Sequence, residues 1–143
     1  MTKSRARHSN DNALAECKNG AVIRKILGYM HIPQKWADRI NEFNQKYLVP
    51  YLNFHRPCFF AEEKTDKKGK VKKTYPYKKI MMPYEKLKSL PNAKQYLKKG
   101  ISFADLDREA MQMTDLESAK QMHNQRNLLF RKIFSADRKS FIK

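Results

Sequence analysis

One helical stripe of large apolar residues constrains the fold more than any other feature of the sequence. Its members follow one another at intervals of three or four residues: Trp36, Ile40, Phe43, Tyr47 and Tyr51. This spacing predicts a helix from about Gln34 with one broad aromatic face, which must be covered by another element. A buried core is therefore a better interpretation of this face than a binding platform. Pro50 lies inside the pattern and predicts a kink or break just before it.

The segments on either side of this helix also carry readable signals. Helical periodicity runs from Asn12 to about Leu27, where Gly28 should end the helix, and Pro33 should open the next segment. Residues 58–80 predict a β-hairpin with its turn at Asp66–Gly69. Pro76 should restrict the second arm of that hairpin to an edge strand.

From Pro83 onward the sequence predicts helices again. Two short helices should be ended by Pro91 and Gly100, and Ser102 with Asp105 and Thr114 with Glu117 form the pattern of capping boxes. One side of the last helix should carry Leu116, Ala119, Met122, Leu129, Phe130 and Ile133. The basic tail from Ser135 should be frayed. The expected fold class is mainly α with a small β-hairpin.

The charge balance points to a polyanionic partner. The chain has 143 residues, with 31 Lys and Arg against 14 Asp and Glu, a net charge of +17. Such an excess attracts nucleic acid first, with an anionic membrane surface as the main competitor. No apolar run approaches the roughly 20 residues that span a bilayer. Cys17 and Cys58 lack metal-site or disulfide spacing, so a reducing cytoplasm is expected.

Lysines concentrate around the predicted hairpin. The cluster comprises Lys64, Lys67, Lys68, Lys70, Lys72, Lys73, Lys78 and Lys79, with only Asp66 as an internal acid. These side chains could follow phosphate oxygens along a nucleic acid, and Tyr75 and Tyr77 could stack on an unpaired base. The alternative is a solvated loop whose lysines protect an edge strand from pairing.

Glu16 lies in line with the apolar residues of the first helix. Residues 16, 20, 23 and 27 share one side because their spacing is four, three and four. An ionised carboxylate buried there without a partner would cost several kcal/mol. Either Glu16 lies in the first turn and reaches water, or the helix presents it at the rim of a packed face as a metal ligand or acid–base group.

Three sequence blocks resemble the bacterial insertion-sequence transposases that have a retroviral-integrase-like core, the DDE family. The first is Asp-Asn-Ala-x-x-Glu, from Asp11 to Glu16. The second is "NFHRP", Asn53 to Pro57, at the end of the aromatic helix. The third is "MMPYEKL", in which Met82 replaces the usual Thr. They occur in the family's order and cover roughly residues 4–90.

The resemblance implies a ribonuclease-H-like fold in which two Asp and one Glu hold two Mg²⁺ or Mn²⁺ ions for cutting and joining DNA. By position, Glu16 is the third metal ligand and the catalytic residue. Basic residues on this helix approach DNA in the family, which assigns DNA contacts to Lys18, Arg24 and Lys25. An ordinary solvated helix face is the alternative for these three residues. The hairpin residues Lys67, Lys68, Lys70, Lys72 and Lys73 are the other predicted DNA contacts.

The sequence departs from the family in one decisive respect. Both catalytic Asp residues should precede Glu16 by a wide margin, and only Asp11 precedes it. The chain is therefore expected to be the C-terminal fragment of the integrase core, lacking most of the sheet. The expected parts are core helices in 1–57, a basic hairpin in 58–82 and a helical extension in 83–143.

This interpretation sets the expected function and partners. The function is DNA integration, with a catalytically incomplete chain that does not hold metal well alone. The expected partners are DNA, further copies of the chain or a full-length transposase, with no membrane, in a bacterial cytoplasm near the nucleoid. The competing hypothesis is a non-enzymatic basic DNA-binding protein, such as a truncated transposase product that regulates transposition. A basic RNA- or membrane-associated protein is the third.

Overall fold

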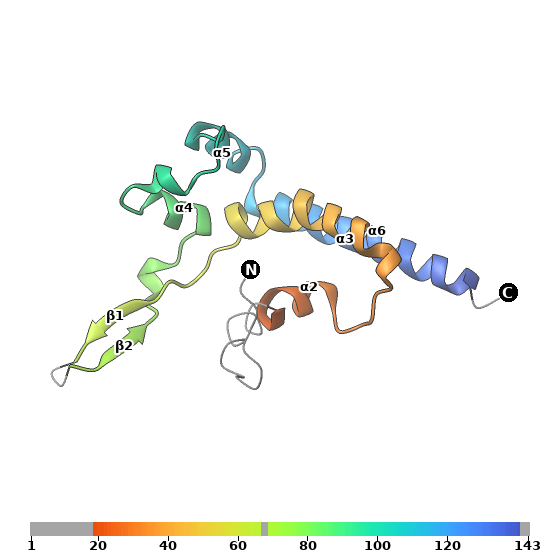
Figure 1. Cartoon of the computed structure of the whole chain (residues 1–143), viewed down its shortest axis with the longest axis horizontal. Coiled ribbons are helices and arrows are strands. Elements are labelled where there is room, and N and C mark those ends of the chain that lie inside the picture. The colour runs from red at the N-terminus through yellow and green to blue at the C-terminus, as the bar shows by residue number, and fades with distance from the viewer. Residues whose placement is uncertain (1–18, 67–68, 141–143) are drawn as a thin grey trace. The chain divides into compact units, whose positions relative to one another are not determined.

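The computed structural model describes residues 19–66 and 69–140 (Figure 1). Within these ranges the chain is mainly helical and has one antiparallel sheet of two strands, which confirms the predicted fold class at this level. The chain divides into two compact units, residues 1–37 and residues 38–143.

The described part of the first unit is a short helix, a connection without regular secondary structure and a 3₁₀-helix. The π-helix η2 (Asn19–Arg24) continues into α2 (Lys25–Leu27). The helix ends at Gly28, whose φ of 81° few other residues adopt readily, as the sequence predicted. Pro33 then precedes the 3₁₀-helix η3 (Gln34–Trp36), which confirms the predicted start of the next helical segment. The beginning of the predicted first helix lies outside the described residues.

A long helix crosses Pro50 without a break. It is built from α3 (Ala37–Phe43), η4 (Asn44–Leu48) and η5 (Tyr51–His55), and residues 49–50 join η4 to η5 in helical conformation. Of the predicted kink or break before Pro50, the break is therefore wrong. The reason is that η4 and η5 are π-helical, as in the bond from the Val49 N–H to the Asn44 carbonyl. These wider turns change the hydrogen-bond register around a residue that has no N–H of its own.

The core of the second unit lies between this helix and α6 (Asp115–Ser140), which packs against η4 and η5 (Figure 1). Phe43 and Leu48 are buried on the first helix, and Met122 and Ile133 are each only 2% exposed on α6. Ile40, Tyr47 and Tyr51 are half-buried. The interpretation of the stripe as a core face is therefore confirmed for its members in the second unit, whereas Trp36 belongs to the first unit.

The inward face of α6 matches the sequence prediction except at its start. Ala119, Met122 and Ile133 lie inward, whereas Leu116 is 63% exposed. Leu116 lies six residues before Met122, which places it about 240° around the helix from the buried stripe. The small residue Ser118 is buried in its place. The predicted fraying from Ser135 is also wrong as far as Ser140, where α6 ends, and the last three residues of the tail lie outside the described part of the chain.

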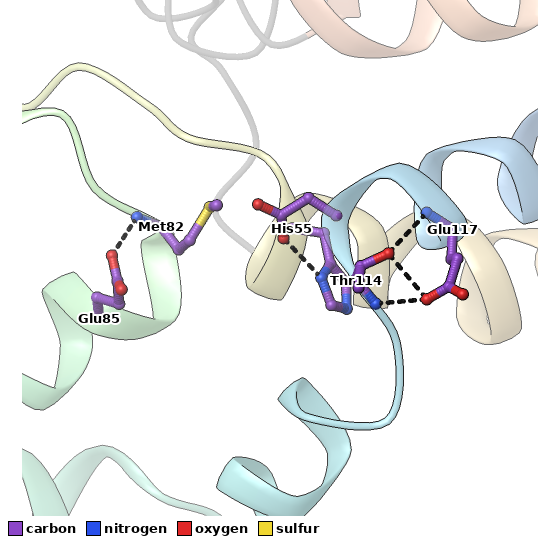
Figure 2. A network of polar contacts seen from close by, with 6 residues as sticks. His55, Met82, Glu85, Thr114 and Glu117 are labelled. Atoms are coloured by element: carbon purple, nitrogen blue, oxygen red, sulfur yellow. Dashed lines mark hydrogen bonds and ion pairs between the residues drawn. The ribbon is translucent and has the colours of Figure 1, made fainter.

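The start of α6 is held by two polar contacts (Figure 2). Thr114 donates its N–H (2.9 Å) and its hydroxyl (2.8 Å) to Glu117 Oε2, and the Glu117 N–H donates back to Thr114 Oγ1 (3.3 Å). This is the predicted capping box. Beside it, the buried His55 at the end of η5 lies with Nδ1 3.0 Å from Asp115 Oδ1. The two helices are therefore joined by a polar contact as well as by their core.

Three short helices occupy residues 83–110. They are α4 (Pro83–Lys88), the 3₁₀-helix η7 (Ala93–Tyr96) and α5 (Phe103–Ala110). The predicted Ser102–Asp105 capping box begins α5. α4 ends at Lys88 with Ser89 as its C-cap, two residues before Pro91, as predicted. The predicted end at Gly100 is wrong, because η7 stops at Tyr96 and Leu97 is extended.

Tyr84 joins α4 to α5. Its hydroxyl donates to Asp107 Oδ1 (2.7 Å), and Lys88 Nζ donates to both oxygens of the same carboxylate (2.8 and 3.0 Å). Burial, followed by the hydrogen bond to Asp107, raises the pKa of the Tyr84 hydroxyl. The hydrogen bond from Lys88, followed by that from Tyr84, lowers the pKa of Asp107 below its ordinary value of 3.8.

We expect the protein to lose stability in acid. The pKa values of two other carboxyl groups are also lowered. The hydrogen bonds from Ser102 lower the pKa of Asp105, and those from Thr114, the backbone bond first, lower the pKa of Glu117. A carboxyl group whose pKa is lower in the folded state stabilises the fold above its unfolded pKa, and this contribution disappears as the pH falls through the folded pKa. Urea midpoints should therefore fall between about pH 5 and pH 3. Asp107→Asn should flatten this fall, and an unchanged slope would contradict the assignment.

The sheet is the hairpin of β1 (Glu62–Thr65) and β2 (Val71–Thr74). The Gly69 N–H donates to the Asp66 carbonyl at 3.0 Å, and the Asp66 N–H donates to the Lys70 carbonyl at 3.0 Å. Gly69 has φ 76°, the region in which glycine is favoured. The predicted hairpin and its turn at Asp66–Gly69 are confirmed. β2 ends at Thr74, two residues before Pro76, which was predicted to limit the second arm of the hairpin.

Candidate nucleic-acid interface

The register of the hairpin places two lysines directly opposite each other. Lys64 pairs with Lys72, one step nearer the turn than the Glu63–Lys73 pair. Side chains of directly opposed residues share a face with their Cβ atoms about 5 Å apart, and like charges in this position are destabilising. The repulsion between Lys64 and Lys72 therefore destabilises the hairpin, and the backbone pairing of the strands would form equally well without two lysines at these positions.

Only part of the lysine charge is neutralised by the hairpin's own acids. Lys73 Nζ lies 3.7 Å from Glu63 Oε1, and Lys79 forms an ion pair with Glu62. Among the residues that the structure describes, four lysines of this region have no ion pair: Lys64, Lys70, Lys72 and Lys78. We call these four residues the free lysine group. Their charge is available to a partner.

The strands of the hairpin are solvated on both faces. Only Glu62 and Thr74, at the end away from the turn, are partly covered, and Val71 is 54% exposed. A two-stranded hairpin without a buried face is marginally stable in water. Packing therefore does not explain the sequence of this segment.

Aromatic residues gather where the hairpin joins the rest of the second unit. The Cys58 N–H donates to the Met81 carbonyl (3.0 Å), and this bridge closes the base of the ribbon. Next to the bridge, the rings of Phe59 and Tyr77 meet in a T-shaped contact with centroids 5.4 Å apart. Tyr77 is in the 3₁₀-helix η6 (Tyr77–Lys79). Our sequence analysis missed Phe59, and the adjacent pair Phe59–Phe60 was the available signal.

The two phenylalanines of that pair have different surroundings. Phe60 is half-buried, and Lys86 Nζ of α4 lies 5.8 Å from its ring centroid. Phe59 is 50% exposed, Tyr75 is 56% exposed and Tyr77 is 81% exposed. The segment that holds the free lysine group therefore also holds three solvent-exposed aromatic residues, Phe59, Tyr75 and Tyr77, of which Phe59 and Tyr77 are in contact.

The predicted contacts of the first unit are separate from the hairpin in sequence. Arg24 and Lys25 are both exposed, and the Arg24 guanidinium lies over the Tyr29 ring at 5.6 Å from its centroid. Tyr29 is itself 84% exposed. An exposed guanidinium resting on an exposed ring remains open to a further anion, so the role of Arg24 as a DNA contact stays a prediction.

Four predicted site residues lie outside the described part of the chain: Glu16, Lys18, Lys67 and Lys68. Their assignments as metal ligand or DNA contacts stay predictions. Across residues 19–66 and 69–136, no three His, Cys, Asp or Glu side chains lie together as a metal site. The predicted contacts that the structure brings together are Lys70, Lys72 and Lys73, which are all exposed residues of the hairpin.

Comparison with known proteins identifies one partial similarity. Over 77 residues, 52% of this chain, the sequence is 36% identical to the uncharacterized protein y4rM of Sinorhizobium fredii (strain NBRC 101917 / NGR234). The matched region covers about a fifth (21%) of the length of that protein. No family model matches the chain, and no solved structure matches it. No helix in the described ranges is both long and apolar enough to cross a membrane.

Proposed function

We propose that the chain functions in DNA integration as the C-terminal portion of a DDE-type transposase, and that it binds DNA through its basic hairpin. The observation that carries the binding proposal is the solvated Lys64–Lys72 pair, together with the absence of acidic partners for the free lysine group among the described residues. The ordered sequence blocks ending at Glu16, Pro57 and Leu87 support the family assignment.

Phosphate binding accounts for the cost of the opposed lysines. Two ammonium groups about 5 Å apart at Cβ repel each other, and a phosphodiester between them would replace this repulsion by two attractions. The ribbon projects these groups into solvent on both strands, so a polyanion could approach without displacing core residues. The contacts would be to the backbone of DNA and would carry no sequence information.

Catalysis would require more than this chain provides. Bound Mg²⁺ or Mn²⁺ would supply charge stabilisation for phosphoryl transfer, with Glu16 as one ligand. Each Mg²⁺ needs several oxygen ligands, and a single family carboxylate does not provide them for two ions. The residues of this chain therefore do not fit the two-metal centre unless another polypeptide contributes. We infer that the chain binds DNA but does not join strands by itself.

We expect binding of the whole chain to a labelled 30-base-pair DNA to depend steeply on salt. If the four free lysines contact phosphates, log Kobs should fall with log salt with a slope of about −3 to −4. This corresponds to roughly a hundredfold loss of affinity between 50 and 200 mM salt. Fluorescence anisotropy over a salt series measures the slope. Affinity that does not change with salt would refute DNA binding through this group.

The family assignment has its own test. Coding DNA upstream of Met1 should encode, in the same or a shifted frame, strands that carry two Asp residues. Purified chain should show no Mg²⁺-dependent nicking of DNA. Nicking that disappears in Glu16→Gln would contradict catalytic incompleteness. A regulatory DNA-binding protein without catalytic activity would show the same salt-dependent binding. The absence of any such upstream reading frame would favour this stand-alone binding protein over a fragment of a transposase.

A further inference from the structure

Three exposed aromatic residues border the free lysine group at the base of the hairpin. Phe59, Tyr75 and Tyr77 lie within a stretch of 20 residues, 59–78, that also contains Lys64, Lys70, Lys72 and Lys78. The Cys58–Met81 bridge and the Lys79–Glu62 ion pair hold the two arms together at this point. The aromatic and cationic groups are therefore parts of one local structure.

The geometry of the Phe59–Tyr77 pair leaves ring surface open. The planes meet at 78°, so the edge of one ring contacts the face of the other. This contact uses a small part of each ring, and Tyr77 is left 81% exposed. A further planar group could stack on the open ring surface. By contrast, Phe60 is half-buried and has Lys86 Nζ 5.8 Å from its ring centroid, so less of its surface is open.

Cations beside open aromatic rings are suited to an unpaired nucleic-acid strand. Every base has a π-face that can stack on Phe or Tyr when it is not already stacked in a duplex, while lysines contact the adjoining phosphates. A duplex offers its phosphates but not its base faces. From this juxtaposition we propose that the base of the hairpin binds single-stranded DNA in preference to duplex, with unpaired bases stacking on Tyr77 and Phe59.

This inference rests on the proposed DNA-binding function and adds the preferred form of DNA. It assigns two different roles within one surface. The free lysine group contributes to both single-stranded and duplex binding, because both forms carry phosphates. The aromatic pair contributes only when bases are unpaired. The two roles can therefore be separated by mutation.

The test compares the full-length chain with its Tyr77→Leu and Phe59→Leu variants. The probes are a labelled 20-nucleotide mixed-sequence DNA strand and the same strand in a duplex, both at 100 mM salt. Each substitution should weaken single-strand binding about 5- to 50-fold and change duplex binding less than twofold. Leucine retains apolar character but has no ring, so a loss reports stacking.

Tyr96→Leu is the matched control. Tyr96 is also an exposed tyrosine of the second unit (60%), lies among lysines, and takes part in none of the ring contacts found in the described residues. Its replacement should leave both affinities unchanged. Ultraviolet cross-linking of a thymine-containing strand, followed by peptide mass spectrometry, should locate adducts at residues 59–77. Circular dichroism of each variant checks that the helices remain folded.

The possible failures are distinguishable. If wild-type chain binds neither form, the proposed function itself fails. If the wild type binds both forms equally and Tyr77→Leu has no effect, DNA binding survives and the stacking proposal is overturned. Tenfold tighter binding to an RNA strand of the same sequence would overturn the assignment to DNA. Binding of anionic phospholipid vesicles that depends on Tyr77, without binding of the strand, would identify the surface as membrane-associated and overturn the proposal.

Discussion

Replacing the four free lysines with glutamine should weaken DNA binding by roughly 10³-fold at 0.1 M salt. The estimate follows from counterion release: each phosphate contact adds about 0.9 to the salt exponent, so each is worth about eightfold between 1 M and 0.1 M salt. Four contacts multiply to about 4,000-fold, and each contact that is not made divides this factor by about eight. The salt slope should fall by about one unit for every contact removed. Anisotropy titrations of the Lys64, Lys70, Lys72 and Lys78 variant measure both quantities.

A second quadruple variant separates local contacts from overall charge. Glutamine at Lys94, Lys98, Lys99 and Lys132 removes the same four charges, from +17 to 17 − 4 = +13, at other exposed positions of the second unit. This control should lose much less affinity and keep its salt slope. If both variants weaken binding equally, DNA responds to net charge and the hairpin is not the interface.

The Lys64–Lys72 pair should also show opposite effects on binding and stability. Replacing either lysine with glutamine removes a like-charge contact, so the hairpin should become more stable by roughly 0.2–1 kcal/mol, while DNA affinity decreases. A residue needed only for folding would affect both properties in the same direction. Hydrogen exchange of the β1 and β2 amides measures the stability of the hairpin independently of the helical core.

Ile133→Ala should lower the free energy of unfolding by about 2–5 kcal/mol. Ile133 is 2% exposed and lies on the face of α6 that is buried with Met122. Its truncation removes buried hydrocarbon and leaves a cavity that the surrounding helices fill only partly. Because small domains have only about 5–15 kcal/mol of stability, this change is large enough to populate unfolded chain. Urea denaturation followed by circular dichroism measures it.

Leu116→Ala provides the comparison within the same helix. The removed hydrocarbon is of similar size, but Leu116 is 63% exposed, so the loss should stay within about 0.5 kcal/mol. Equal losses for the two substitutions would mean that the buried face of α6 has been assigned to the wrong side of the helix.

Features governed by neighbouring residues were predicted well from the sequence. The Asp66–Gly69 turn, the end of α2 at Gly28 and the capping boxes at Ser102 and Thr114 each depend on residues within a few positions of one another. Their hydrogen bonds are largely independent of the rest of the fold, and the sequence therefore contains most of the information needed to place them.

Features governed by distant partners were predicted less well. The π turns on either side of Pro50 and the outward position of Leu116 arise where one long helix packs on another, and no local pattern specifies how the two faces meet. At the candidate interface, composition predicted the lysines. The opposition of Lys64 and Lys72 requires the strand register, and the exposure of Phe59 requires knowledge of what covers Phe60.

The Cys58–Met81 bridge has a consequence for how this chain can vary. The bridge brings together the two ends of the 22-residue segment 59–80. The chain segments before and after the hairpin are therefore joined at this point whatever the length of the hairpin. Insertions or deletions near the tip would change only the closure entropy of an already short loop. The ribbon could therefore change its length and reach while the packing of Leu48, Met122 and Ile133 stays as it is.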